Sequence, residues 1–290
     1  MLKSLLITMR PKQWIKNLFI FTALVFAEKL FELQLLARTI IAFILFCLIS
    51  SCVYLINDLA DMEKDRRHPI KSKRPLASGQ LKPSVAIAAT IALMAASLLG
   101  SFSLSPLFGL IALAYLLIMI AYSFALKDIV IIDALTLALG FVLRAVAGAV
   151  VIAVPISPWL YVCTTLLALF LSFGKRRHEL ILLEEGADEH RAILREYTPR
   201  LLDEMIAIIT SAAVMAYSLY TFSAPNLPPN HSMMLTIPFV LYGIFRYLYL
   251  IHVKNKGGSP EELLIEDMPL IIDILLWGIA VVAILYVFKG

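Results

Sequence analysis

The chain has 290 residues, of which 61% are hydrophobic, and its mean hydropathy is +0.87. A soluble domain is usually about 45–50% apolar, so this composition excludes an ordinary soluble protein. The net charge is only +4, which gives no sign of a nucleic-acid partner. The apolar runs lack the alternation of polar and apolar residues that a membrane barrel needs, so we expect an all-α integral membrane protein.

Nine apolar stretches approach the length of about 17–25 residues that a transmembrane helix needs. They are 14–34, 39–57, 83–101, 105–124, 129–151, 157–174, 202–222, 233–252 and 269–288. Glu28, Lys29 and Glu32 interrupt the end of the first stretch. We therefore predict a single polytopic membrane domain over residues 1–290, with about nine transmembrane helices.

The loops between these stretches fall into two sets by charge. Lys and Arg gather in the N-terminal segment and in two motif loops, 58–82 and 175–200, whereas the segments SFSLS, VPIS and SAPNLPPNHS carry none. By the positive-inside rule, the N-terminus and the motif loops are cytoplasmic and the C-terminus lies outside. We expect a multi-pass protein of the plasma (inner) membrane.

The first polar motif is RPKQWIKN at positions 10–17, where the first stretch begins. Gln13 and Asn17 lie one helical turn apart, as expected of residues that face a bundle interior, and the bases suit a phosphate at the headgroup level. A positive-inside anchor with Trp14 at the interface is the alternative. The candidates for binding a lipid phosphate are Arg10, Lys12, Gln13, Lys16 and Asn17.

The second motif is NDLADMEKDRRHPIKSKRPLASG at positions 57–79. On a helix, Asp58, Asp61 and Asp65 would share one face, and Tyr54 and Asn57 would lie at its edges. Carboxylates so close together repel each other unless a cation lies between them, and oxygen ligands suit Mg²⁺, with Mn²⁺ as the other candidate. Lys71, Lys73 and Arg74 follow and suit phosphate groups. A solvated charged loop is the alternative.

The third polar cluster, YSFALKD at positions 122–128, closes the fourth stretch. Tyr122 and Lys127 are candidates for ligand and phosphate contacts, and a snorkelling lysine beside an interfacial tyrosine explains them equally well. Asp133 and Arg144 lie inside the fifth stretch, three helical turns apart. Ionisable residues within a membrane usually face the bundle interior, so we expect these two to form a structural ion pair, with contact to the substrate as the alternative.

The fourth cluster, SFGKRRHEL at positions 172–180, ends the sixth stretch. Lys175 and Glu179 are four residues apart and so face the same way on a helix, with Arg176 and Arg177 beside them. A stop-transfer anchor is the alternative to a second half-site. The acidic residues that follow, up to Glu189, are expected to be solvated rather than metal ligands.

The motif at 57–79 resembles the first aspartate-rich motif of the UbiA superfamily of intramembrane prenyltransferases, in which Asn-Asp is followed by an Asp three positions on and another four further. The resemblance covers essentially the whole chain. It implies nine transmembrane helices around a central cavity, with two polar motifs at the cytoplasmic mouth that bind Mg²⁺ and a diphosphate.

The fourth cluster departs from the prenyltransferase pattern, because it stands where that family has its second aspartate-rich motif. Prenyltransferases carry further carboxylates after the sixth span, whereas this chain has GKRRHEL, with one carboxylate and an excess of bases. Together with RPKQWIKN and HPIKSKRP, this resembles the decaprenyl-phosphate phosphoribosyltransferase branch. The resemblance implies an Mg-dependent membrane enzyme of cell wall biosynthesis that moves 5-phosphoribose from phosphoribosyl diphosphate to a polyprenyl phosphate.

This resemblance also implies roles for the residues. The predicted catalytic residues are Asp58, Asp61 and Asp65, and the predicted metal ligands are these three and Asn57. The predicted donor-binding residues are Tyr54, Lys71, Lys73, Arg74, Tyr122, Lys127, Lys175, Arg176, Arg177 and Glu179. In this scheme the bases of the fourth cluster serve the distal phosphate of the donor, and Glu179 serves its hydroxyls. The division of the bases between donor and lipid acceptor stays open.

Two other functions remain as alternatives. One is a UbiA-type prenyltransferase that attaches a polyprenyl chain to an aromatic or other small acceptor. The other is a membrane protein without catalytic activity, such as an anion carrier, in which the carboxylates bind an ion without turnover. The sequence leaves open the length of the lipid and the oligomeric state, a homo-oligomer included.

Overall fold

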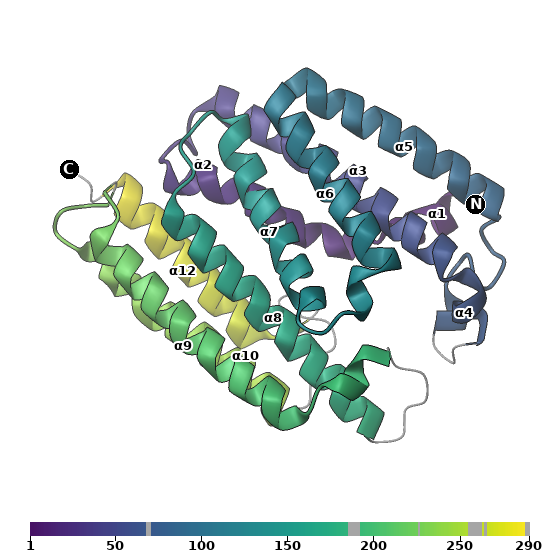
Figure 1. Cartoon of the computed structure of the whole chain (residues 1–290). Coiled ribbons are helices and arrows are strands. Elements are labelled where there is room, and N and C mark those ends of the chain that lie inside the picture. Colours follow the sequence, from purple (N-terminus) through teal and green to yellow (C-terminus); the bar gives the residue numbers. More distant parts are fainter. Residues whose placement is uncertain (68–70, 185–191, 226, 255–262, 264–265, 288–290) are drawn as a thin grey trace. The chain divides into compact units, whose positions relative to one another are not determined.

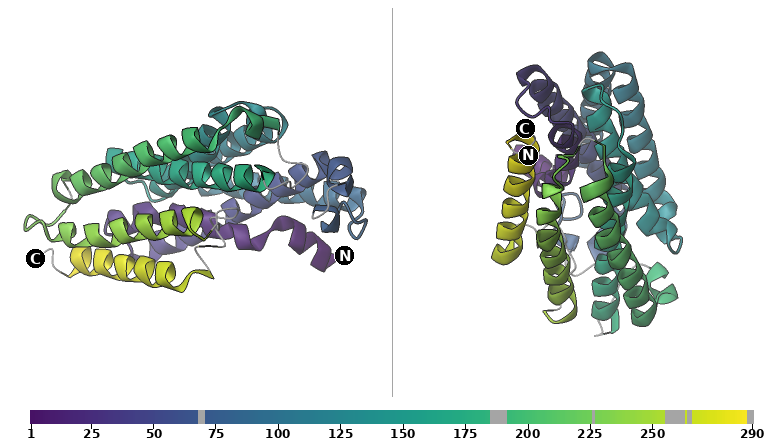
Figure 2. Two further views of the ribbon diagram at one scale, coloured as in Figure 1. Left: turned by 90° about the horizontal axis from the view of Figure 1, so that it is seen from below. Right: turned by 90° about the vertical axis from the view of Figure 1, so that its left-hand side faces the viewer.

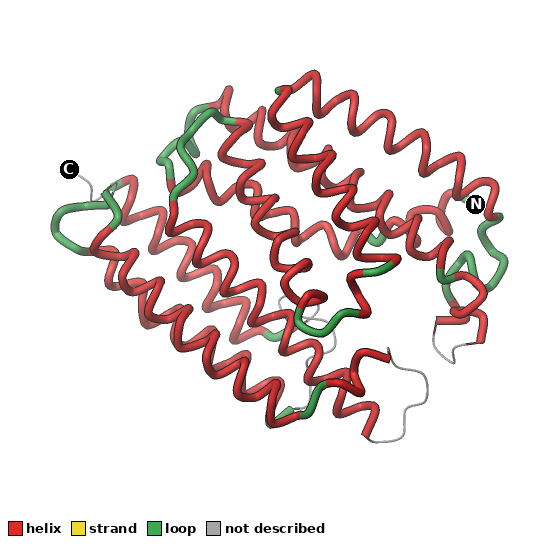
Figure 3. The backbone as a smooth tube through the Cα atoms, viewed as in Figure 1, coloured by secondary structure: helices red, strands yellow, loops and turns green. Residues whose placement is uncertain are grey.

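A computed structural model describes residues 1–290 except 68–70, 185–191, 226, 255–262, 264–265 and 288–290. Every regular element in the described part of the chain is a helix (Figure 3). Eight helical segments there are long and apolar enough to cross a membrane. They are Leu33–Ala60, Pro83–Leu104, Pro106–Phe124, Ile132–Val151, Pro158–Ile181, Pro199–Ser223, Ser232–His252 and Met268–Tyr286. The prediction of an all-α, multi-pass membrane fold is confirmed.

These eight segments correspond to the second to ninth predicted spans. The transmembrane helices are α3 (Leu33–Ala60), α5 (Pro83–Leu104), α6 (Pro106–Phe124), α7 (Ile132–Val151), α8 (Pro158–Glu184), α9 (Pro199–Ser223), α10 (Ile237–His252) and α12 (Met268–Tyr286). Several of them begin with a proline in the first turn, where the missing N–H costs no hydrogen bond. Helices α3 and α8 run on past their apolar stretches, and so both carry polar motifs at their C-terminal ends.

The first predicted span, 14–34, differs from the prediction. The chain there forms a 3₁₀ helix, η1 (Pro11–Phe21), followed by the short helix α2 (Thr22–Phe26). It then turns at Glu28, which has a φ of 60° and lies in the left-handed region. The charged residues that interrupt this stretch therefore mark the end of its helix.

A glycine on α7 accommodates η1. A Cβ atom added to Gly148 would collide with the backbone carbonyl oxygen of Ile20, so only glycine permits this close approach of two backbones. The core residues Ile20 and Leu24 are completely buried. The N-terminal segment is thus packed as an integral part of the helical bundle.

The chain divides into two compact units. Unit 1 consists of Met1–Leu24, Glu32–Lys127 and Leu143–Pro155, and unit 2 of Val25–Phe31, Asp128–Val142 and Ile156–Gly290. In unit 1, α3 packs against α1 (Leu2–Met9), η1, α5 and α6 (Figure 1). The connection from α3 to α5 carries the short helices α4 (Met62–Arg67) and η2 (Lys71–Lys73), and η3 (Leu126–Asp128) follows α6.

In unit 2, α9 packs against α8 and α10, and α10 packs against α12 (Figure 2). The remaining elements are η4 (Ala192–Glu196), which precedes α9, and η5 (Ser232–Thr236), which precedes α10. Aromatic and aliphatic side chains such as Phe170, Leu202 and Tyr247 form a hydrophobic core of unit 2. The Asp267 carboxylate caps α12 and also accepts both hydrogen bonds from the Arg246 guanidinium, which ties α10 to α12.

Candidate functional site

The second sequence motif forms the aspartate cluster of unit 1, defined here as Asp58, Asp61 and Asp65. Helix α3 ends at Ala60, and Asp61 is its C-cap, with its N–H bonded to the carbonyl of Asn57 at 2.9 Å. Helix α4 begins at the next residue, so the helical spacing of the three carboxylates is nearly preserved. Asp58 and Asp65 are buried, at 2% and 3% exposure, whereas Asp61 is about one-quarter exposed, at 27% for its side chain.

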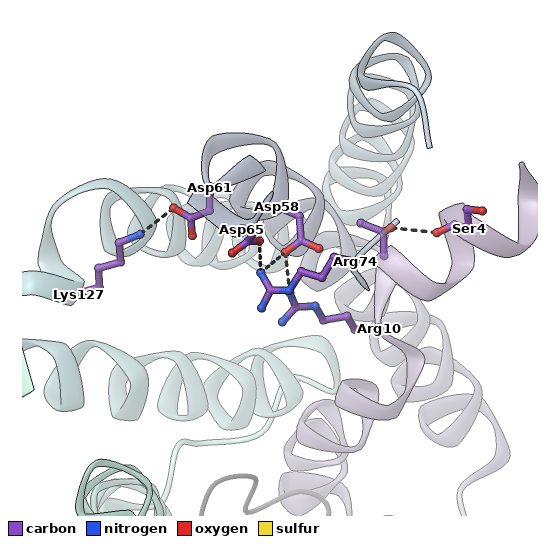
Figure 4. Close-up of polar contacts among 8 residues, drawn as sticks. Ser4, Arg10, Asp58, Asp61, Asp65, Arg74 and Lys127 are labelled. Carbon is purple, nitrogen blue, oxygen red and sulfur yellow. Dashed lines mark hydrogen bonds and ion pairs between the residues drawn. The ribbon is translucent and has the colours of Figure 1, made fainter. Parts of the chain in front are cut away.

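Two arginines bind the buried carboxylates (Figure 4). Arg10 Nη2 donates to Asp58 Oδ1 at 2.6 Å. Arg74 Nη1 lies between two carboxylates, at 2.6 Å from Asp65 Oδ2 and 3.2 Å from Asp58 Oδ1. Burying two carboxylates is costly unless cations pair with them, and these two guanidinium groups balance the two charges.

The third carboxylate has a different partner. Lys127, on η3, places its Nζ 3.4 Å from Asp61 Oδ1 (Figure 4). The structure therefore brings Lys127 of the YSFALKD cluster to the aspartate cluster. Tyr122, from the same sequence cluster, is half-buried near the end of α6.

Arg10 lies at the joint between α1 and η1. Its backbone is left-handed, with φ 54° and ψ 63°, which is uncommon for a residue with a side chain. Its guanidinium lies over the ring of Tyr54, 4.8 Å from the centroid, as well as beside Asp58. The structure thus joins a predicted lipid-phosphate residue, Arg10, to predicted donor and metal residues.

The remaining residues of the first motif lie in two environments. Lys12 is exposed, and Gln13 and Lys16 are half-buried. Trp14 is half-buried and donates its Nε1–H to Ser51 Oγ at 3.1 Å. This motif therefore packs one face against α3 and leaves bases at the surface, as an interfacial segment does. In the second motif, Lys71 is half-buried and Lys73 is exposed.

Asn17 belongs to a buried polar network of unit 1. It is completely buried, and its Oδ1 accepts hydrogen bonds from Arg144 Nε at 2.6 Å and from Ser50 Oγ at 3.3 Å. Arg144 also donates to Tyr115 Oη at 2.7 Å. The predicted ion pair between Asp133 and Arg144 is wrong, because each binds other partners: Asp133 accepts from Arg176.

The fourth sequence motif forms the α8 cluster of unit 2, defined here as Lys175, Arg176, Arg177 and Glu179. Arg176 is only 1% exposed and donates through Nε to Asp133 Oδ2 and through Nη1 to Glu179. Arg177 pairs with Asp203 of α9, and Lys175 is half-buried. Of the two carboxylates that hold Arg176, only Glu179 reaches the surface, with its side chain 20% exposed.

Tyr197 was not singled out in the sequence, and Asp133 was identified only as an ionisable residue within a span. The Tyr197 hydroxyl donates to Asp133 Oδ1 at 3.1 Å and accepts from the backbone N–H of Ile131 at 2.7 Å. Burial raises the pKa of the Tyr197 phenol to about 12, so it keeps its proton at neutral pH. Tyr197 follows a charged amphipathic stretch, where no spacing distinguishes it from other interfacial tyrosines.

The metal prediction rests on the chemistry of the aspartate cluster. Within the described residues, no three His, Cys, Asp or Glu side chains are grouped closely enough to hold a metal ion, and Arg74 Nη1 pairs with both Asp58 and Asp65. Carboxylate oxygens are nevertheless the donors that Mg²⁺ prefers, and Asn57 adds an amide oxygen at the same helix end. The donor set fits a hard divalent cation. Of the acidic residues expected to be solvated, Glu185, Asp188 and Glu189 lie outside the described residues, and Glu184 is the last residue of α8.

Comparisons with known proteins identify the family of this chain. The sequence matches the model of the UbiA prenyltransferase family over residues 17–263. A decaprenyl-phosphate phosphoribosyltransferase from Corynebacterium glutamicum is 32% identical over 287 residues, which cover 96% of this chain and 86% of that protein. The enzyme of the same name from Mycobacterium tuberculosis is 31% identical over 272 residues, which cover 92% of this chain and 89% of that protein.

A solved structure shares the fold. A UbiA homologue from Archaeoglobus fulgidus bound to GPP and Mg²⁺ matches with a TM-score of 0.73 and 20% sequence identity, covering 98% of this chain and 100% of that one. At this level of identity the likeness concerns the fold. It agrees with the arrangement of helices expected from the sequence.

Proposed function

Because this chain belongs to the UbiA prenyltransferase family, we propose that it transfers 5-phosphoribose from phosphoribosyl diphosphate to a polyprenyl phosphate of the decaprenyl type. The observation that carries this proposal is the similarity to two decaprenyl-phosphate phosphoribosyltransferases over 96% and 92% of the chain. The excess of bases in the α8 cluster agrees with a donor that carries a second phosphate.

The reaction exchanges one carbon–oxygen bond for another. The bond between the anomeric carbon and the diphosphate breaks, and its electron pair leaves with the diphosphate. An oxygen of the lipid phosphate supplies the electron pair of the new bond, so the products are polyprenyl-phosphoryl-5-phosphoribose and diphosphate. The acceptor phosphate is already ionised, and no strong general base is required. Catalysis therefore consists mainly of positioning and charge stabilisation.

The aspartate cluster is the proposed site for a divalent cation, Mg²⁺ or Mn²⁺. Asn57, Asp58, Asp61 and Asp65 would hold it, and a bound cation supplies neutralisation of the leaving diphosphate. Arg10 and Arg74 hold two of these carboxylates in place. Guanidinium groups also bind phosphate oxygens in a bidentate manner, which makes both arginines suited to the donor diphosphate.

The lipid phosphate is assigned to the bases of the first motif that remain near the surface. Lys12 is exposed and Lys16 half-buried, and Gln13 lies between them. Arg10 is paired with Asp58, which supports its placement on the donor side instead. The long apolar tail of the acceptor would then lie along the membrane-spanning helices.

The α8 cluster supplies the groups that the sugar end of the donor requires. Lys175 suits the distal phosphate, and the Glu179 carboxylate accepts hydrogen bonds from hydroxyls. Arg176 is buried between the carboxylates of Asp133 and Glu179, so we assign it the role of holding Glu179 rather than of contacting the donor. This replaces the direct donor contact assigned to Arg176 from the sequence alone.

We also propose an orientation. The N-terminus and the two motif loops face the cytoplasm, and the C-terminus lies outside, in the plasma membrane of the cell. The basis is the charge asymmetry of the loops. This orientation gives the polar motifs access to a cytoplasmic, water-soluble donor.

A binding measurement tests the choice of donor. The purified protein in nanodiscs is titrated with phosphoribosyl diphosphate and with geranyl diphosphate, each in the presence of Mg²⁺. We expect the phosphoribosyl compound to bind, and Lys175→Ala to weaken its binding by roughly 10–150-fold, the equivalent of one charged hydrogen bond. Binding of geranyl diphosphate alone would favour a prenyltransferase instead.

A further inference from the structure

Four side chains of unit 2 form a continuous chain of hydrogen bonds from a loop to the surface. The Tyr197 hydroxyl donates to Asp133, Asp133 accepts from Arg176, and Arg176 donates to Glu179. Asp133 and Arg176 are 0% and 1% exposed, and Tyr197 is 3% exposed. Glu179 alone has a substantially accessible side chain, at 20%. Glu179 is therefore the member of this hydrogen-bond network that is accessible from the surface.

The side chains of Asp133 and Tyr197 bond to other groups of this network or to the adjacent backbone. Both Asp133 oxygens accept a bond, one from Tyr197 and one from Arg176. The Tyr197 hydroxyl both accepts, from the Ile131 N–H, and donates. Two nitrogens of the Arg176 guanidinium donate to carboxylates, one to Asp133 and one to Glu179. Buried hydrogen-bond networks of this kind restrain the positions of their members.

The backbone beside this network is strained. Ile131 has a φ of 68°, and a β-branched residue rarely adopts the left-handed region. Its N–H is the group that bonds to Tyr197, directly before α7 begins. Strained backbone of this kind persists where surrounding contacts hold it, and it is concentrated at functional sites. Tyr197 therefore fixes both the turn before α7 and the carboxylate of Asp133.

We propose that Tyr197, Asp133 and Arg176 are positioning residues that fix the carboxylate of Glu179 for the hydroxyl groups of the pentose in the donor. This inference rests on the proposed function, because it names the part of that donor which Glu179 recognises. It assigns Arg176 no contact with the donor. A guanidinium that donates to a carboxylate restricts the orientation of that carboxylate, and recognition of a diol requires such a fixed orientation.

The test compares phosphoribosyl diphosphate with analogues that lack the 2- or the 3-hydroxyl group. For each variant, kcat/KM is measured for the complete donor and for each analogue, and the ratio of the two values is the preference for the complete donor. KM is also measured for the lipid acceptor. We expect Glu179→Gln to reduce the preference for the complete donor by at least about tenfold, the scale of one lost hydrogen bond to a charged group. Tyr197→Phe and Arg176→Lys, which keep size or charge, should reduce it by a similar factor while leaving the KM for the lipid unchanged.

A double substitution separates positioning from a general loss of stability. If Tyr197 acts through Glu179, Tyr197→Phe should reduce the preference in the wild-type background and have no further effect on it in the Glu179→Gln background. Tyr242→Phe is the matched control, because Tyr242 is 46% exposed on α10, and it should change nothing. Melting temperatures in detergent identify any variant that fails to fold, and Arg176→Lys then provides the independent comparison.

Two results would overturn the inference, and they differ from failure of the proposed function. If Tyr197→Phe and Arg176→Lys retain the full preference for the complete donor, Tyr197 and Arg176 do not position Glu179. If Tyr197→Phe is equally harmful with and without Glu179, it acts on overall structure. Absence of any product from phosphoribosyl diphosphate in the wild-type protein would instead contradict the proposed function, and with it the role assigned to Glu179.

Discussion

The guanidinium of Arg10 lies 2.6 Å from the carboxylate of Asp58, although 48 positions separate the two residues in the sequence. This pair joins the N-terminal RPKQWIKN motif to the aspartate-rich motif at the end of α3. It changes the expected division of the bases, because Arg10 lies with the carboxylates rather than with Lys12 at the surface.

We therefore predict that Arg10→Ala weakens donor binding by roughly 10–150-fold and changes lipid binding much less, because it removes a charged hydrogen-bond donor from the aspartate cluster. Lys12→Ala is the matched control from the same motif, and it should weaken the lipid acceptor more than the donor. Separate titrations of donor and lipid in nanodiscs make the comparison. Loss of lipid binding alone in Arg10→Ala would return this residue to the lipid phosphate.

The metal proposal predicts different outcomes for two neighbouring carboxylates. Asp61→Asn should lower turnover by at least about 10²-fold, since it removes one of the proposed ligands. Glu63→Gln should leave turnover near that of the wild type, because the Glu63 side chain is 70% exposed and pairs with Arg66 at the surface. Turnover is measured over a range of Mg²⁺ concentrations. A normal rate and normal Mg²⁺ dependence in folded Asp61→Asn protein would exclude Asp61 from the metal site.

The close approach of η1 to α7 predicts a difference between two glycines. Gly148→Ala forces a Cβ atom against the Ile20 carbonyl, so we expect destabilisation of about 1–3 kcal/mol, the usual cost of overpacking. Gly278→Ala, on α12, meets no atom within 4 Å and should be neutral or stabilising by up to about 1 kcal/mol, because alanine favours the helix. Thermal unfolding in detergent measures both. Equal melting temperatures would show that η1 moves freely away from α7.

Loop charges predict the orientation of the chain. In a background from which Cys47, Cys52 and Cys163 have been removed, cysteines introduced at Ser72 and at Ser223 should be labelled from opposite sides of the membrane. The reagent is a membrane-impermeant maleimide, applied to right-side-out and inverted vesicles. Labelling of both positions from one side would require a different number of crossings between α3 and the end of α9.

The sequence was sufficient to locate the transmembrane helices, because runs of apolar residues and prolines in first turns are local signals. It was insufficient for η1, where the packing of Gly148 against Ile20 connects segments more than 120 residues apart. The sequence was also insufficient to predict which partner each buried charge binds. Asp133 pairs with Arg176 on another helix rather than with Arg144 on its own, and such choices depend on how the helices pack.

The sequence likewise predicted one part of the candidate site and not the rest. Helical spacing identified the aspartate cluster, since three carboxylates at the end of a span are an uncommon pattern. Arg10 and Lys127 reach that cluster from other elements, which no spacing indicates. Tyr197 was missed because an interfacial tyrosine is ordinary in a membrane protein, and its bond to Asp133 depends on the turn at Ile131.

Mass spectrometry of the lipid product tests the central proposal most directly. The wild-type protein in nanodiscs is incubated with Mg²⁺, polyprenyl phosphate, an aromatic acceptor, and phosphoribosyl diphosphate and a prenyl diphosphate together, with Asp58→Asn protein as the inactive control. We predict a polyprenyl phosphate heavier by one phosphoribosyl group, with one diphosphate released for each product molecule and none of this product with Asp58→Asn. A prenylated aromatic product, with phosphoribosyl diphosphate left unconsumed, would contradict the proposed function.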